Sequence, residues 1–120
     1  MPSTQTFAAA AVAAPHMLAA EAGRAVLAEG GNAVEAMVAM AAAIAIVYPH
    51  MNGIGGDGFW LIREPNGKLR YIEACGFAGA GVDAKAYRKA GHDRIPPRGP
   101  LSVLTVPGAI GGMRSWPWSR

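Results

Sequence analysis

The sequence contains one cysteine, few charged residues and few aromatic residues. Of its 120 residues, 16% are charged and 8% are aromatic, whereas 52% are hydrophobic. The single Cys75 excludes an internal disulfide framework and fits a reducing compartment. This composition is typical of a globular, core-rich chain rather than a disordered one. With so few charges to cover a surface, we expect the chain to form part of a larger hydrophobic core.

The sequence also lacks features of membrane, secreted and nucleic-acid-binding proteins. Its apolar stretch Ala33–Val47 is shorter than the ~20 residues that a membrane span needs, and residues 1–14 have no basic n-region of a secretory signal. The formal net charge is +3, and the basic residues from Lys85 to Arg98 cluster only loosely, with Asp83 and Asp93 among them, which favours a solvated face. We therefore expect a cytoplasmic chain with neither nucleic acid nor membrane as partner. A periplasmic location is the alternative if the natural N-terminus carries a signal.

The stretch around Ala33–Val47 organises the rest of the chain. Asn32 precedes it and Glu35 follows three residues later, which is an Asn variant of the capping box. Almost every residue of the stretch is Ala, Val, Met or Ile, and Pro49 ends it. The pattern predicts a helix that is buried on all sides, because no face of it gains from contact with water.

Two elements are expected before this helix. The short run of small apolar residues Phe7–Ala14 predicts a buried strand, and a helix follows from Met17 to about Glu29. Gly30 and Gly31 are expected to take the positive φ that ends this helix. Its inner stripe is predicted to be Leu18, Ala22, Ala25 and Val26, with Glu21, Arg24 and Glu29 facing outward.

A glycine-dense loop, Gly53–Gly58, follows the apolar helix and matches the G-x-G-x-x-G pattern. A dinucleotide-binding fold needs that pattern after a strand and before a helix. Here the predicted order is reversed, so a nucleotide-binding module is the least favoured interpretation, and a strand directly before Gly53 would revive it. Two interpretations stay open: the glycines allow a tight turn and close packing, or the loop lines a site and contributes amides.

The second half of the chain predicts a hairpin followed by a short helix. Aromatic and branched residues on two arms support strands, and a Pro-Asn-Gly sequence between them supports a turn. A capping aspartate and a terminating glycine bound the helix. The predicted elements are strands Phe59–Ile62 and Leu69–Glu73, a turn at Glu64–Gly67, a helix Ala84–Ala90 capped by Asp83 and ended by Gly91, a connector over residues 92–100, a strand Leu101–Val106, and a helix with Pro107 in its first turn.

The histidines and the cysteine do not form a metal site. His16, His50 and His92 are too scattered for metal-ligand spacing, and no paired cysteines or carboxylate cluster appears. We therefore expect no metal. For His16, a loop or first-turn histidine with a satisfied hydrogen bond is favoured over a chemical role.

The sequence resembles the start of the large subunit of gamma-glutamyltranspeptidases, over roughly residues 9–112. The combination of a double-glycine-Asn-Ala segment with a Gly-Ile-Gly-Gly segment at this spacing is a specific signal of this family. The matching residues are Pro15-His16, Ala19, Glu21-Ala22-Gly23, Leu27, Gly30-Gly31-Asn32-Ala33, Pro49, Gly53-Ile54-Gly55-Gly56, Phe59 and Val106-Pro107-Gly108.

This resemblance implies an α+β chain that is a fragment of the four-layer αββα sandwich of N-terminal-nucleophile hydrolases. In such enzymes the precursor cuts itself, and a newly exposed threonine of the small subunit attacks the amide, with its own α-amine as base. Of Thr4, Thr6 and Thr105, none lies in a Thr-Thr-His-type cleavage motif. The chain alone is therefore expected to be catalytically inert, to need the small subunit of the same precursor as partner, and to use no cofactor.

The resemblance also identifies one substrate-binding position. Gamma-glutamyl enzymes carry an arginine after the second hairpin strand, where its planar fork clamps the donor carboxylate. Aligning Ile72–Ala74 with the family's strand end puts Cys75 at that position, and the nearest basic residues in sequence are Arg70 and Lys85. Because a cysteine cannot pair with a carboxylate in this way, a smaller or differently charged amide such as oxamate is an alternative substrate. Cys75 has no sequence context that would activate it as a nucleophile.

We assign residues 1–112 to the large-subunit-like part and residues 113–120 to an irregular tail. The segment from Met113 to Arg120 shows neither helical nor strand periodicity, which suggests truncation or a frameshift after about Gly112, with a natural irregular tail as the alternative. Besides an enzyme piece for gamma-glutamyl transfer or amide hydrolysis, a non-catalytic remnant remains open.

Overall fold

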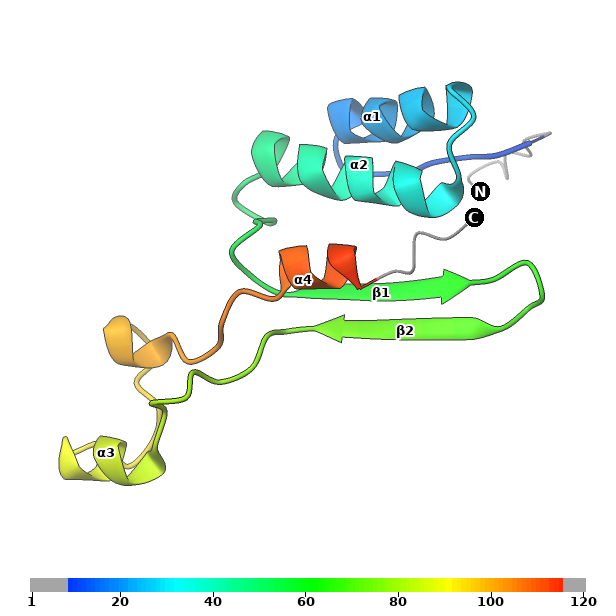
Figure 1. The fold of residues 1–120 in the computed structure, drawn as a ribbon. Helices are drawn as coiled ribbons and strands as arrows, with labels where there is room; N and C mark the ends of the chain where they lie inside the picture. Colours follow the sequence, from blue (N-terminus) through cyan, green and yellow to red (C-terminus); the bar gives the residue numbers. More distant parts are fainter. Residues whose placement is uncertain (1–8, 116–120) are drawn as a thin grey trace, which may run out of the picture. The chain divides into compact units, whose positions relative to one another are not determined.

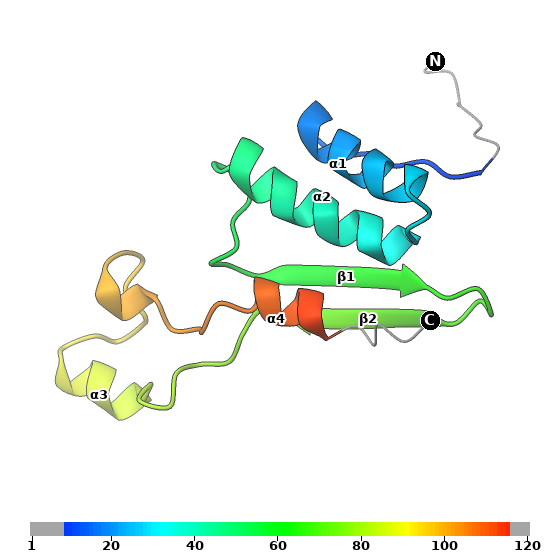
Figure 2. The same cartoon turned by 45° about the horizontal axis from the view of Figure 1, so that its top comes forward.

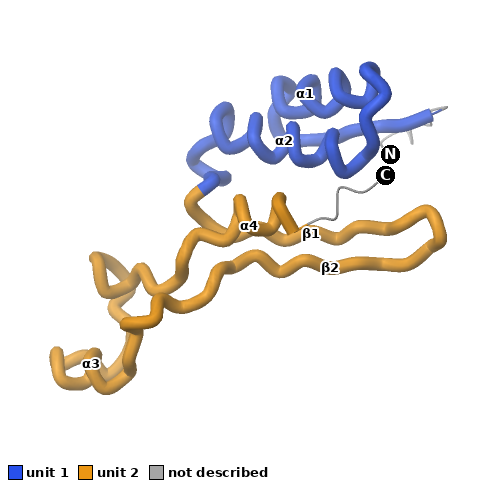
Figure 3. The backbone as a smooth tube through the Cα atoms, viewed as in Figure 1, with its two compact units in different colours: residues 1–54 blue, residues 55–120 orange. Residues whose placement is uncertain are grey.

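The computed structural model describes residues 9–115, which form two compact units, residues 9–54 and residues 55–115 (Figure 3). Among the described residues no helix is long and apolar enough to cross a membrane. The elements are, in chain order, α1 (Met17–Ala28), α2 (Ala33–Val47), β1 (Gly58–Arg63), β2 (Leu69–Ala74), α3 (Ala84–Lys89), a short 3-10 helix η1 (Pro100–Ser102) and α4 (Ala109–Arg114).

The first unit is a pair of helices that pack side by side, α1 and α2 (Figures 1 and 2). Small residues let the two backbones approach closely: Ala19 of α1 and Ala36 of α2 are buried. Gly23 faces Met40, and a Cβ on Gly23 would lie 2.5 Å from the Met40 sulfur. The contact between these helices thus depends on residues with little or no side chain.

The start of α2 confirms the predicted capping box. The Asn32 side chain accepts hydrogen bonds from the N–H groups of Val34 and Glu35, at 2.9 and 3.0 Å. The Glu35 carboxylate in turn accepts from the N–H of Asn32 at 2.8 Å. Donors that the first turn of a helix leaves unpaired are therefore satisfied, and α2 spans the predicted residues.

Several predictions for the first unit are wrong. Residues 9–14 form no strand and are largely exposed, and Phe7 and Ala8 lie outside the described residues. Leu18 is 55% exposed, because Ala19 and Gly23 occupy the contact stripe in its place. Gly30 has the positive φ expected at the end of a helix, but Gly31 does not.

Helix α2 is also not buried on all sides within the described chain. Ile46 is 78% exposed and Met37 is 47% exposed. A single neighbouring helix, α1, covers only one stripe of an apolar helix. The composition thus predicted that α2 is covered on all sides, and the first unit by itself does not provide that cover.

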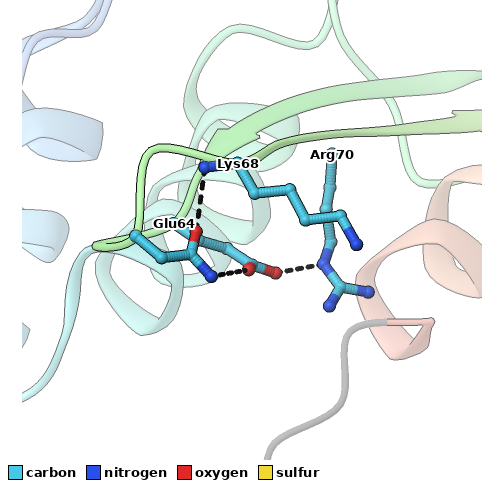
Figure 4. A network of polar contacts seen from close by, with 4 residues as sticks. Glu64, Lys68 and Arg70 are labelled. Carbon is cyan, nitrogen blue, oxygen red and sulfur yellow. Dashed lines mark hydrogen bonds and ion pairs between the residues drawn. The ribbon is translucent and has the colours of Figure 1, made fainter.

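The second unit is built on the antiparallel hairpin of β1 and β2, which confirms the predicted hairpin. Its turn is closed by two backbone hydrogen bonds of 2.8 Å, from Glu64 N–H to the Lys68 carbonyl and from Gly67 N–H to the Glu64 carbonyl. Arg70 pairs with the Glu64 carboxylate (Figure 4), and this hydrogen bond lowers the pKa of the Glu64 carboxyl. The turn end of the hairpin is thus tied by polar groups.

The two faces of the hairpin differ. Helix α4 packs on the face that carries Trp60 and Ala74, and a Cβ on Gly112 would lie 2.6 Å from the Cβ of Ala74. The opposite face carries apolar side chains that stay open to solvent. Burying one such side chain contributes about 1.5–3 kcal/mol, so this face leaves considerable stabilisation unused. The exposed residues are Phe59, Leu61, Leu69 and Tyr71.

The rest of the second unit partly follows the predictions. Asp83 caps α3 by accepting from the N–H of Lys85 at 3.0 Å, and Gly91 follows the helix with a φ of 84°. The predicted strand Leu101–Val106 is wrong: η1 occupies its start, and an isolated bridge between Ala78 and Thr105 is what remains of strand pairing there.

The start and end of α4 also differ from the sequence predictions. Pro107 precedes the helix instead of opening its first turn, because Gly108 is the N-cap. The predicted irregular segment is wrong for Met113 and Arg114, which lie in the last turn of α4, while residues 116–120 lie outside the described residues.

Candidate functional site

The start of β1, the end of β2 and the N-terminus of α4 meet at one end of the hairpin (Figures 1 and 2). Gly58 pairs with Ala74 in the ladder, so Asp57 and Cys75 are the next residues beyond the last pair. The Gly56 carbonyl accepts hydrogen bonds from the N–H groups that begin α4, those of Gly108 at 3.1 Å and Ala109 at 3.0 Å. We call this region, residues 56–58, 74–76 and 108–109, the hairpin end.

Two glycines let the backbones cross at the hairpin end. Gly76 has a φ of 76°, and a Cβ on it would lie 1.6 Å from the carbonyl oxygen of Val106. A Cβ on Gly108 would lie 2.2 Å from the carbonyl oxygen of Ala74. No L side chain fits at either distance. This glycine crossing, Gly76 and Gly108, fixes the backbone on both sides of Cys75.

The surroundings of Cys75 are acidic. Its thiol, half-buried, donates a hydrogen bond to the Glu73 carboxylate at 3.4 Å. Partial burial, the hydrogen bond to Glu73 and the negative charges of Glu73 and Asp57 all raise the pKa of the Cys75 thiol. A thiol that stays protonated is a poor nucleophile, and two neighbouring carboxylates disfavour a bound anion. Cys75 therefore offers neither a nucleophile nor a cation that would pair with a carboxylate.

Within the described residues, the basic side chains near in sequence are not among the charges that act on Cys75. Arg70 pairs across the hairpin with Ile62, near the turn, and bonds Glu64 there (Figure 4). Lys85 belongs to the first turn of α3. In the described chain, the charges that act on Cys75 come from carboxylates. Sequence reasoning found Cys75 but missed its neighbour Asp57, which the predicted hairpin would have placed opposite Cys75 once its register was known.

The glycine loop is preceded by a helix and followed by a strand, with α2 before it and β1 after it. This order rules out the dinucleotide-binding interpretation. A Cβ on Gly53, Gly55 or Gly56 would meet no atom within 4 Å, and none of the three has a positive φ. Neither backbone conformation nor packing within the described chain therefore requires glycine at these positions.

The histidines play local roles. His16 is the N-cap of α1, and its Nδ1 accepts a hydrogen bond from the N–H of Leu18 at 3.2 Å, which confirms the prediction of a satisfied histidine. The His50 ring lies 4.2 Å from the Tyr48 ring. Across residues 9–115, no three His, Cys, Asp or Glu side chains gather as ligands of a metal ion would. Thr105 lies in the bridge to Ala78, and Thr4 and Thr6 lie outside the described residues.

Comparison with known proteins places the chain in a protein family. The family profile described as Gamma-glutamyltranspeptidase matches residues 19–116, and the chain is a member of that family, as the sequence resemblance indicated. The structure is similar to the Helicobacter pylori gamma-glutamyltranspeptidase, with a TM-score of 0.78 and 32% identity over 92% of this chain and 32% of that one. The Pseudomonas nitroreducens enzyme gives a TM-score of 0.76 and 31% identity over 91% of this chain and 33% of that one.

Among curated relatives, the oxamate amidohydrolase proenzyme of Klebsiella pneumoniae is 58% identical over 99 residues, which are 82% of this chain and 18% of the relative. The glutathione hydrolase-like YwrD proenzyme of Bacillus subtilis is 44% identical over 100 residues, 82% of this chain and 19% of the relative. The chain thus spans about a fifth of the length of these curated relatives. The predicted fold class, an α+β piece of the N-terminal-nucleophile hydrolase fold, is confirmed by these similarities.

Proposed function

We propose that the chain is the N-terminal part of the large subunit, residues 1–112, of an enzyme precursor that hydrolyses or transfers an acyl group from an amide. Its relatives are named as proenzymes, which supports a precursor that cuts itself into two subunits. The nucleophilic threonine belongs to the small subunit, so this chain alone is inert. Such an enzyme works in the cytoplasm, where the single Cys75 stays reduced.

The chemistry follows from an N-terminal threonine. Its α-amine takes the proton of its own hydroxyl, and the hydroxyl oxygen attacks the amide carbonyl to form a tetrahedral intermediate. The C–N bond then breaks, the leaving amine takes the proton back from the α-amine, and an acyl-enzyme remains. Water or an acceptor amine then releases the acyl group. Preorganised N–H groups stabilise the oxyanion of each tetrahedral intermediate. The contribution of this chain is to line the acyl site with the glycine loop and the hairpin end.

The substrate is a small amide that is not held through a gamma-glutamyl α-carboxylate. The observation that carries this proposal is the acidic setting of Cys75, next to Glu73 and Asp57. The sequence resemblance aligns Cys75 with the family's carboxylate-binding arginine. The 58% identity to the oxamate amidohydrolase proenzyme supports an amide of the oxamate kind. Gamma-glutamyl transfer, with a place in glutathione metabolism, is the second candidate, since several relatives are named as glutathione hydrolases.

A substitution in the complete, processed enzyme tests this specificity. We expect Cys75→Arg to raise kcat/KM for a gamma-glutamyl anilide at least about tenfold, because a bidentate guanidinium then pairs with the α-carboxylate. Cys75→Ser, which changes the thiol but adds no charge, is the matched control and should leave that value within about twofold. If the unchanged enzyme already turns over the anilide as well as Cys75→Arg, the specificity argument is wrong.

The mass of the gene products in the native host tests the enzyme assignment itself. Two fragments, the second beginning with threonine, would support an autoprocessing hydrolase. A single species near 12.4 kDa would instead support a non-catalytic remnant, and the enzyme proposal would be withdrawn.

A further inference from the structure

Residues 82–104 fold back on themselves and line an open pocket of about 370 Å³. Helix α3 forms one wall, and the segment after it, as far as Leu104, forms the other. The Tyr87 hydroxyl donates a hydrogen bond of 2.7 Å to the Leu101 carbonyl, which ties the helix to the returning segment. The walls therefore come from one continuous stretch of chain that is held together by its own contacts.

Most of the pocket lining is apolar. Val82, Ile95 and Leu104 line the pocket together with the Tyr87 ring. Val82 is 39% exposed and Ile95 is 54% exposed, so the described chain leaves this apolar surface open. A ligand with an aromatic ring or a branched hydrocarbon group would cover it and gain from burial.

Two of the lining residues carry guanidinium groups. Arg88 and Arg94 line the pocket, with His92 and a single carboxylate, that of Asp93. Within residues 9–115 the ion pairs are those of Arg24 and Arg70, so neither Arg88 nor Arg94 is paired with a carboxylate there. Guanidinium groups pair with carboxylates through parallel N–H···O bonds. These two groups are therefore available to an anion, whereas the apolar lining suits an apolar group.

We propose that this pocket binds a small amphiphilic carboxylate, with its apolar group against Val82, Ile95 and Leu104 and its carboxylate at Arg88 and Arg94. Its volume lies in the range of about 300–1,000 Å³ that is usual for small-molecule sites. The combination of an apolar lining with a few convergent polar groups is also typical of such sites. This inference goes beyond the proposed function, because it uses neither Cys75 nor the glycine loop.

A titration with phenylacetate, followed by NMR on the purified full chain, tests the proposal. Phenylacetamide has the same ring and nearly the same shape but carries no charge, so it measures the contribution of the two guanidinium groups. We expect phenylacetate to shift the resonances of Tyr87, His92 and Ile95, and phenylacetamide to bind at least about fivefold more weakly. Equal affinity for the two probes, or no binding of phenylacetate, overturns the proposal.

Charge-removing variants locate the anion. Arg88→Gln and Arg94→Gln should each weaken phenylacetate binding at least about fivefold. Lys89→Gln is the matched control, since it removes one positive charge from the helix that carries Arg88, at a residue that does not line the pocket, and its effect should stay below about twofold. An equal loss in Lys89→Gln would show general attraction to a basic segment and would overturn the site.

Two further results also bear on the proposal. If Arg88→Gln or Arg94→Gln fails to fold, as judged by circular dichroism, the comparison of phenylacetate with phenylacetamide on the unchanged chain still tests whether the pocket binds a carboxylate. A dimer in sedimentation whose Tyr87 and Ile95 resonances ignore phenylacetate would show that a second copy fills the pocket, and would overturn the small-molecule proposal. Neither result depends on amide hydrolysis, so failure here and failure of the proposed function are distinguishable.

Discussion

Both the glycine loop and the glycine crossing are rich in glycine, but for different reasons. At the crossing, Gly76 and Gly108 lie where a Cβ would stand 1.6 and 2.2 Å from a backbone carbonyl oxygen. In the loop, a Cβ on Gly53 or Gly55 would meet open space. The crossing glycines are explained by contacts inside the chain, whereas the loop glycines are not.

This difference separates glycines that maintain the fold from glycines whose role lies in contacts with groups outside the described chain. A glycine required by packing is a stability device, because a side chain there would push two backbones apart. A glycine without any such requirement, on an exposed loop next to a proposed substrate position, is better explained by what approaches it from outside. The comparison therefore supports the proposal that the loop lines the acyl site, and alanine substitutions test both halves of it.

The largest effect is expected at the crossing. Gly76→Ala combines a left-handed φ of 76° with a backbone overlap, and we expect it to lower the free energy of unfolding of the full chain by about 3 kcal/mol or more. Urea denaturation monitored by circular dichroism measures this value. A loss below about 1 kcal/mol would show that residues 74–76 and 106–108 do not cross as described.

A smaller effect is expected where conformation alone requires glycine. Gly91 has a φ of 84°, but a Cβ on it would meet nothing within 4 Å. Gly91→Ala should therefore cost only about 1–2 kcal/mol, the price of placing an L residue in the left-handed region. The difference between the Gly76 and Gly91 variants, from the same denaturation experiment, isolates the contribution of close packing. Equal losses would remove the packing argument.

Local sequence signals predicted much of the fold. The Asn32–Glu35 box, the hairpin turn at Glu64–Gly67 and the Asp83 cap each depend on residues close in sequence, and the structure confirms them. The failures concern residues whose state depends on distant partners. The strand Leu101–Val106 would need a neighbouring strand along its whole length, and the structure offers a single bridge at Thr105.

The candidate site was predictable in part. Family resemblance led to Cys75, while periodicity and composition did not distinguish it from any half-buried cysteine. Its acidic setting depends on the hairpin register, which pairs Gly58 with Ala74 and which turn composition alone does not determine. The predicted solvated face from Lys85 to Arg98 is confirmed, since its basic residues are exposed, but charge spacing does not show that Arg88 and Arg94 line one pocket with apolar residues.

The smallest effect on stability is expected in the glycine loop, and it is the most informative. Gly55 has no positive φ and no neighbour for a Cβ, so Gly55→Ala should leave the free energy of unfolding unchanged or raise it by about 0.4–1 kcal/mol, through a less flexible unfolded chain. In the complete enzyme the same substitution should lower kcat/KM at least about tenfold, because a methyl group would occupy space that the substrate needs. Unchanged kcat/KM with unchanged stability would mean that the loop glycines serve neither the fold nor the site. A loss of stability without a separate loss of activity would instead place Gly55 with Gly76, as a residue whose role is packing.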